Sequence, residues 1–377
     1  MKKKICIVIL SRANFARIKS VLIELLKFKK INIEVIIGGS ALIDKFGDIE
    51  KDVLKIGLRK IHRVECVIEG SSLASMAKTT GVLLTDLTTI FDNIKPNYIL
   101  TIADRHETLA TAIAARYLNI KLIHTQGGEV TGSVDNNVRD AISMLADFHF
   151  PSTNKSKNRL IKMGINYSRI FNFGCPSLDL LNYKNKLKKD LSFINNIGVG
   201  SNISFQKKKY LVVLQHPDTD MYLKSKEQIT NTIKAIYQIK IPTVWLWPNV
   251  DAGSNIFSKE IRKFRERYNP NFIQFIKNLE PEDYANLIRN CGCLIGNSSS
   301  AIREGSFLGI PAVNIGFRQN MREKAHNIID VNYNHVEIFN AIKKQFSKRF
   351  KSSNLYGKGN SGLLISRQII KLIKSSS

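Results

Sequence analysis

The sequence has few features of a membrane protein or of a disulfide-linked protein. Its five cysteines are an odd number in a chain of 377 residues, which argues against a disulfide framework. No apolar run approaches the roughly eighteen residues of a membrane span. The apolar start, "KICIVIL", stops at Ser11-Arg12 without a small-residue cleavage site, which favours a first β-strand over a signal peptide. We therefore predict a cytoplasmic protein with no membrane partner.

Acidic residues are also scarce: 31 Asp and Glu stand against 57 Lys and Arg, for a formal net charge of +26. Such a charge by itself suggests an anionic partner. The lysines are, however, spread along the whole chain, and they are not interleaved with aromatic residues in any RNA-binding motif. We predict that no nucleic acid binds, and that the charge covers a solvated surface which would still attract a nucleotide diphosphate.

Metal and nucleotide motifs are missing as well. The close pair Cys291-Gly-Cys293 has no second pair to complete a zinc site, so we predict no metal. The stretch "GKGNSG" (357–362) fits a dinucleotide-binding pattern by letter but follows no apolar strand, and we interpret it as a turn into the last helix. No Walker sequence is present.

What the chain does contain is an alternation of strand-like and helix-like segments. Examples are "NIEVIIGG" and "IKLIHT" in the first half and "YLVVLQHP" and "CLIGNSSS" in the second. This rhythm is typical of a doubly wound parallel sheet, and it occurs twice. We predict an α/β protein with two Rossmann-like domains facing a central cleft. The predicted parts are a first domain (1–182), a connecting segment (183–209), a second, nucleotide-binding domain (210–355) and a C-terminal helix (356–377) that packs back on the first domain.

Polar residues gather where strands of the first half end. Arg12 follows the first strand, Asp104 follows another, and "HTQGGEVTGSVDNNVRD" (124–140) follows a third. Because parallel sheets bind ligands at the carboxyl ends of their strands, these residues are site candidates.

Several motifs together resemble the hydrolysing UDP-N-acetylglucosamine 2-epimerases of the sialic-acid type. They are "SRANFARIKSVL", "ADRHETLATAIAA", "HTQGGEVTGSVDNNVRDAI", "FNFGCPSLD", "QHPDTD" and "GNSSSAIREGSFLGIPAVNIGFRQ". They run in order over nearly the whole chain. The resemblance implies the GT-B architecture, no cofactor, and a homodimer or homotetramer.

The resemblance also implies a reaction. A base removes the C2 proton of a nucleotide-linked 2-acetamido sugar while the nucleoside diphosphate leaves C1, and water then adds to the resulting glycal. UDP-N-acetylglucosamine would give N-acetylmannosamine and UDP. Alternatives are the same chemistry on a UDP-2,4-diacetamido-2,4,6-trideoxy-hexose or a GDP-linked sugar, and a GT-B glycosyltransferase.

Five residues are the candidates for catalysis. The resemblance assigns acid or base work to Asp104 and Asp135, although Asp135 could instead cap a helix. The family commonly has a catalytic Glu where this chain has Gln126. An amide cannot take up a proton at neutral pH, so either the other acids suffice, or Glu129 assists, or the chemistry differs. His216 matches a family histidine that contacts the diphosphate, and its alternative is a structural role.

The candidates for substrate binding come from both halves. Arg12 matches an arginine near the diphosphate, and Arg139 matches one that orders the sugar; their alternatives are a loop arginine and a helix-surface arginine. The hydroxyls of Ser298, Ser299 and Ser300 would bind the diphosphate at the start of a helix, where capping is the other reading. Glu304 matches a family acid on the ribose, and Arg318 lies near one that contacts the nucleotide.

Overall fold

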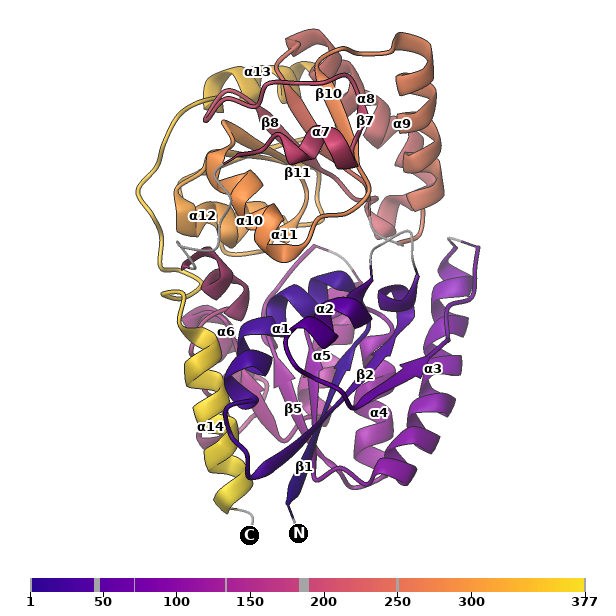
Figure 1. Ribbon diagram of the computed structural model, residues 1–377, viewed down its shortest axis with the longest axis vertical. Coiled ribbons are helices and arrows are strands. Elements are labelled where there is room, and N and C mark those ends of the chain that lie inside the picture. The colour runs from indigo at the N-terminus through magenta and orange to yellow at the C-terminus, as the bar shows by residue number, and fades with distance from the viewer. Residues whose placement is uncertain are drawn as a thin grey trace. The chain divides into compact units, whose positions relative to one another are not determined.

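The computed structural model describes residues 2–43, 48–70, 72–132, 134–182, 190–248 and 251–375. The chain forms two compact α/β units (Figure 1). The first contains Met1–Val130, Asp135–Asn182 and Tyr356–Ser377, and the second contains Thr131–Val134 and Tyr183–Leu355. Residues 183–189 of the predicted connecting segment lie outside the described residues.

The first unit is built on a parallel sheet with the strand order β3-β2-β1-β4-β5-β6. Its strands are β1 (Lys3–Ile9), β2 (Ile31–Gly38), β3 (Ile61–Val64), β4 (Tyr98–Ile102), β5 (Lys121–Thr125) and β6 (Phe148–Phe150). Its helices are α1 (Arg12–Leu25), α2 (Ile49–Lys55), α3 (Leu73–Ile94), α4 (Thr108–Tyr117), α5 (Asp135–Leu145), α6 (Asn154–Lys162) and α14 (Ser361–Ser375). Short 3₁₀ segments cover Gly39–Leu42, Tyr167–Arg169 and Pro176–Asn182.

Helices cover both faces of this sheet, which explains why its central strands are continuous apolar runs rather than alternating ones. One face packs against α1, α2 and α14, and the other against α3 and α4 (Figure 1). In β1, Ile5, Ile7 and Ile9 point to the first face, while Cys6 and Val8 point to the second.

The C-terminal helix α14 belongs to the first unit and packs against α1. Its buried residues, Ile365, Ile369, Ile370 and Ile373, recur at helical spacing. Asp179 accepts hydrogen bonds from the backbone N–H groups of Ser361 and Gly362, at 2.9 and 2.6 Å, and so satisfies the first turn of the helix.

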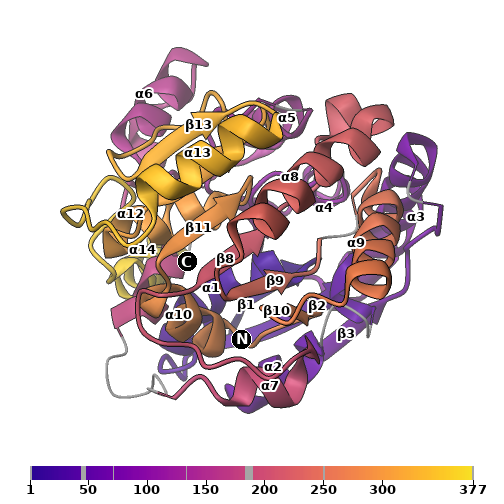
Figure 2. The ribbon, with the colours of Figure 1, turned by 90° about the horizontal axis from the view of Figure 1, so that it is seen from above.

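The second unit has a sheet in the order β13-β12-β11-β8-β9-β10-β7, in which only β7 runs antiparallel among the described strands. Its strands are β7 (Val199–Gly200), β8 (Leu211–Leu214), β9 (Thr243–Leu246), β10 (Ile273–Ile276), β11 (Cys293–Gly296), β12 (Ala312–Ile315) and β13 (Ile328–Val331). Its helices are α7 (Phe193–Ile197), α8 (Ser225–Ile239), α9 (Ser254–Tyr268), α10 (Pro281–Asn290), α11 (Ser299–Ile302), α12 (Glu304–Leu308) and α13 (His335–Gln345). A 3₁₀ segment, Thr219–Lys224, precedes α8. Helices α8, α9 and α13 pack on one face of the sheet (Figure 2).

The two units share one topology, because β10-β9-β8-β11-β12-β13 repeats the order β3-β2-β1-β4-β5-β6. In each sheet the order in which strands are added therefore reverses once, between β1 and β4 in the first unit and between β8 and β11 in the second. Ligands of such sheets bind at this switch point, outside the carboxyl ends of the two strands. The segments that matter most for function are thus those after β1, β4, β8 and β11.

The two doubly wound units predicted from the sequence are confirmed. Part of the segment interpreted as a connection is itself structured: β7 pairs with β10 at the edge of the second sheet. Within the described residues, no helix combines the length and the apolarity that crossing a membrane requires.

Candidate functional site

The first switch point is closed by the start of α1. The side chain of Ser11 caps this helix by accepting a hydrogen bond from the Asn14 N–H at 3.2 Å, and Arg12 is its first residue. Asn14 then joins the ends of the two adjacent strands: its amide donates to Ile102 O at the end of β4, while its carbonyl accepts from Leu10 N–H after β1, both at 3.2 Å. Arg12 and the segment after β4 are thereby held near one another.

Asp104 projects from a sharp turn after β4. Ala103, the residue before it, has a φ of +63°, a left-handed conformation that residues with a Cβ rarely adopt. The turn is held by β5, because the Ala103 N–H donates to Thr125 O at 3.0 Å. A non-glycine residue persists in this region only where its surroundings fix it, which indicates that the direction of Asp104 is set by the fold.

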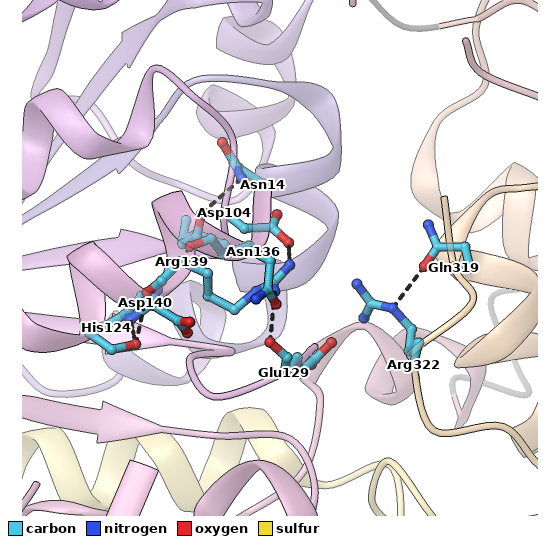
Figure 3. Close-up of polar contacts among 12 residues, drawn as sticks. Asn14, Asp104, His124, Glu129, Asn136, Arg139, Asp140, Gln319 and Arg322 are labelled. Carbon is cyan, nitrogen blue, oxygen red and sulfur yellow. Dashed lines mark hydrogen bonds and ion pairs between the residues drawn. The ribbon is translucent and has the colours of Figure 1, made fainter. Parts of the chain in front are cut away.

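Arg139 of α5 is the main partner of Asp104. Its guanidinium forms an ion pair with the Asp104 carboxylate, and it donates to Glu129 O at 2.7 Å and to Asn136 Oδ1 at 3.2 Å (Figure 3). The Arg139 side chain is only 1% exposed, while that of Asp104 is 13% exposed. The buried positive charge stabilises the ionised form of Asp104, which is the form that a base requires.

Gln126 is buried directly after β5, with a φ of +64°. Its backbone N–H donates to Phe150 O at 2.8 Å, and its side-chain amide donates to Cys175 Sγ at 3.4 Å. The Cys175 sulfur in turn lies 3.1 Å from Ser177 Oγ. The "FGCPSLD" motif therefore supports the side chain of Gln126.

Two of the candidate acids, Glu129 and Asp135, follow Gln126 in the segment 124–140. Glu129 is buried, and its backbone oxygen rather than its carboxylate accepts from Arg139. Asp135 is half-buried and begins α5, where a negative charge favours the helix N-terminus. In the first unit, the structure thus brings together Asp104, Arg139 and the Glu129 backbone.

Glu107 contacts two other residues of the "ADRHE" motif, Arg105 and His106. Its buried carboxylate lies 2.7 Å from Arg105 Nε and 2.9 Å from His106 Nδ1. Burial opposes ionisation, but Arg105 and His106 together hold the pKa of Glu107 well below its usual range. Glu107 therefore stays charged and fixes the two side chains that follow Asp104.

In the second unit, His216 follows β8 and is fixed through its backbone. The His216 N–H donates to Asn297 Oδ1, and Asn297 Nδ2 donates to His216 O, both at 2.8 Å. Gln319 donates to Asn297 O at 3.1 Å and accepts from Arg322 Nε at 2.8 Å (Figure 3). Asn297, like Asn14 in the first unit, bridges the two strands of the switch point. The sequence did not predict this role, although Asn297 lies inside the "GNSSS" motif.

The three serines after β11 are not equivalent. Ser298 caps the four-residue helix α11 by accepting from Ser300 N–H, at 3.3 Å, so the capping role expected of one serine is present. Ser300 Oγ lies 2.6 Å from Tyr284 Oη, and Ser299 is the first residue of α11. Glu304 begins α12 and is half-buried.

Arg318 follows β12. Its guanidinium lies 3.7 Å from the Asp251 carboxylate, and its backbone oxygen accepts from Gly132 N–H at 3.3 Å. Gly132 belongs to the segment 124–140, of which Thr131–Val134 cluster with the second unit. Among the described residues, no group of three or more His, Cys, Asp or Glu side chains is arranged to hold a metal ion.

Two Rossmann-type units, with ionisable and hydroxyl side chains at both switch points, define a protein of the GT-B class. A sequence profile of the family described as UDP-N-acetylglucosamine 2-epimerase matches residues 24–374. The chain belongs to this family and is a nucleotide-sugar 2-epimerase.

Named relatives agree with this assignment. The chain is 31% identical to a UDP-N,N'-diacetylbacillosamine 2-epimerase (hydrolyzing) of Legionella pneumophila, over 95% of this chain and 93% of the relative. It is 28% identical to a GDP/UDP-N,N'-diacetylbacillosamine 2-epimerase (hydrolyzing) of Campylobacter jejuni, over 93% and 90%. The crystal structure of the Methanocaldococcus jannaschii UDP-GlcNAc 2-epimerase in complex with UDP-GlcNAc and UDP shares the fold, with a TM-score of 0.80, 19% identity and coverage of 98% of this chain and 99% of that one. The predicted family and fold class are confirmed.

Proposed function

We propose that the protein is a hydrolysing 2-epimerase that converts UDP-N-acetylglucosamine to N-acetylmannosamine and UDP. The observation that carries this proposal is the Asp104–Arg139 pair at the end of β4, a carboxylate oriented by a buried guanidinium at the switch point of the first sheet. A C–H proton next to C1 is weakly acidic, and its removal requires such a fixed base.

The reaction has two stages. The Asp104 carboxylate takes the C2 proton, the C2–H electron pair forms the C1–C2 double bond, and the C1–O bond breaks to release UDP. Water then adds its oxygen to C1, and a proton arrives at C2 from the opposite face, so that the configuration at C2 is inverted. Asp135 and Glu129 are the candidates for delivering this second proton.

The second unit is proposed to bind the nucleotide. Charge develops on the departing diphosphate, and hydroxyl, imidazole and guanidinium groups stabilise it. His216, Ser299, Ser300 and Arg318 supply such groups. In the first unit, Arg12 remains a candidate for the same role. Glu304 would accept hydrogen bonds from the ribose. Arg139 is so deeply buried that we propose it orders the sugar indirectly, by holding Asp104.

The relatives support a second candidate substrate. The Legionella and Campylobacter proteins are both described as N,N'-diacetylbacillosamine 2-epimerases. The same groups could act on a UDP-2,4-diacetamido-2,4,6-trideoxy-hexose or on its GDP-linked counterpart, because proton removal at C2 and departure of the diphosphate are unchanged. Only the part of the pocket around C4 and C6 would differ.

The experiment is turnover of a panel of these nucleotide sugars in heavy water, with no acceptor, followed by proton NMR. We expect free UDP (or GDP) and a free manno-configured sugar that carries deuterium at C2. A product without deuterium at C2 would contradict elimination. Release of an unepimerised sugar would show simple hydrolysis, and turnover only after an acceptor is added would identify a glycosyltransferase.

Gln126→Glu tests whether position 126 limits the rate. The substitution replaces the amide that donates to Cys175 with a buried carboxyl that cannot donate when ionised. We expect a loss of about 1–3 kcal/mol in the free energy of unfolding and no gain in kcat. Gln126→Met is the matched control, because it removes the same hydrogen bond without adding charge. A large increase in kcat for Gln126→Glu alone would show that a carboxylate at this position takes part in the reaction.

A further inference from the structure

A buried histidine joins the elements that carry Asp104 and Arg139. His124 lies near the end of β5 and is 0% exposed. Its Nε2 lies 2.8 Å from Ala103 O, and its Nδ1 lies 3.1 Å from Ser143 Oγ of α5. Figure 3 shows it beside the network of polar contacts around Arg139.

The protonation of this ring follows from its partners. A carbonyl oxygen only accepts, so Nε2 carries a hydrogen and donates it to Ala103. Burial lowers the pKa of His124 to about 4, although the bond to Ala103 opposes this shift. The ring is therefore neutral at pH 7, and Nδ1 is an acceptor. The Ser143 hydroxyl carries one hydrogen, which it donates either to Nδ1, 3.1 Å away, or to Arg139 O, 2.9 Å away.

One hydrogen bond of the ring restrains the turn that carries Asp104, and the other restrains the helix that carries Arg139. On one side, Ala103 has both its N–H and its C=O bonded to β5, the first to Thr125 O and the second to His124. These bonds hold the left-handed turn from which Asp104 projects. On the other side, Nδ1 of the ring lies 3.1 Å from the hydroxyl of Ser143, which stands one turn after Arg139 on the same helix, α5.

We propose that His124 is a positioning residue for proton abstraction, because its ring fixes the turn that carries Asp104 relative to the helix that carries Arg139. It does not contact the reacting atoms. The proposal rests on the proposed function of Asp104 as the base, and it predicts that the rate depends on one particular hydrogen bond of the ring.

Two conservative variants separate the two bonds. In His124→Gln the longer amide can reach the Nε2 position and donate to Ala103 O. In His124→Asn the shorter amide can still serve Ser143 but does not reach Ala103. We expect the Gln variant to keep kcat within about threefold of wild type, and the Asn variant to lose about 10²-fold in kcat with little change in KM, since a misplacement of about 1 Å can cost that much.

His149→Gln is the matched control. His149 lies on β6 in register with His124, is likewise buried, and has its pKa lowered to about 3 by burial and by the neighbouring His124. In the described part of the chain, neither of its ring nitrogens is hydrogen-bonded to Ala103. We expect its kcat to stay near that of wild type. Equal losses in His124→Asn and His149→Gln, or in His124→Asn and His124→Gln, would overturn the proposal in favour of a general effect of core substitution.

A measurement without substrate separates this proposal from the proposed function. Ring nitrogen NMR shifts of wild-type His124 at neutral pH should show the tautomer protonated on Nε2, and a tautomer protonated on Nδ1 would overturn the positioning role. If wild type incorporates no deuterium into any sugar of the panel, the proposed function fails, whatever the tautomer. If the wild type is active, the rate of deuterium incorporation in His124→Asn should decrease by the same factor as kcat.

Discussion

Asp104→Asn is expected to lower kcat by about 10²–10⁴-fold, the usual contribution of a positioned acid or base. The amide keeps an oxygen that can accept from Arg139, but it cannot take up the C2 proton. The steady-state rate of turnover and the rate of deuterium incorporation at C2 should therefore fall together. Binding of UDP, measured by calorimetry, should change little, since the charge of the diphosphate is met by other residues.

The control for this variant is Asp140→Asn. Asp140 also belongs to α5 and also forms an ion pair with an arginine, Arg159, whose Nη2 lies 2.5 Å from Asp140 Oδ2. The substitution disrupts a more exposed Asp–Arg pair without touching the proposed base, so turnover should stay near that of wild type. If Asp104→Asn keeps a near-normal rate, or loses no more than Asp140→Asn, Asp104 is not the base.

Arg139→Met is expected to cause the largest loss of stability, about 3–5 kcal/mol in the free energy of unfolding. The substitution removes the buried partner of the Asp104 carboxylate and also the donor to Glu129 O. The cost arises because a charge and a carbonyl lose the group that satisfied them, not because the ion pair itself contributes so much. Denaturant unfolding, with the slope compared between variants, measures the change.

A double-mutant cycle identifies the source of this loss. In Asp104→Asn/Arg139→Met both charges are gone, so the double variant should be less destabilised than the sum of the two single variants. Arg139→Lys keeps the charge but not the planar set of donors, and it should fall between wild type and Arg139→Met. Strictly additive losses would contradict the coupling between Asp104 and Arg139.

The fold was predictable where the strands are long and apolar, and less so elsewhere. Strands such as β1 and β2, of seven and eight residues, stand out in the sequence because they are buried on both faces. Strands β3, β6 and β13 were not identified. Strand β6 has only three residues. Strands β3 and β13 have four residues, like the identified strand β11, but they are partly exposed and so lack its continuous apolar run.

The candidate site shows the same division. Asp104, Gln126 and His216 could be proposed from motifs that follow apolar strands, because in parallel sheets that position alone suggests a ligand. Arg139 could equally be a helix-surface residue by its sequence, and only the structure shows that it is buried against Asp104. The roles of Asn14, His124 and Asn297 were not predicted, because their partners are distant in the sequence. The asparagines bond to residues 88 and 81 positions away, and the histidine bonds to one 21 positions away.

By itself, the sequence determined two α/β units, the family, and the segments that carry reactive side chains. These follow from the spacing of apolar residues and from short motifs, which involve only residues close together in the chain. Only the tertiary structure decided which of those side chains meet. The contact of Asp104 with Arg139 depends on β4 lying beside β5, and the contact of His216 with Asn297 depends on β8 lying beside β11. Strand order is set by the packing of the whole sheet, and no short stretch of the chain encodes it.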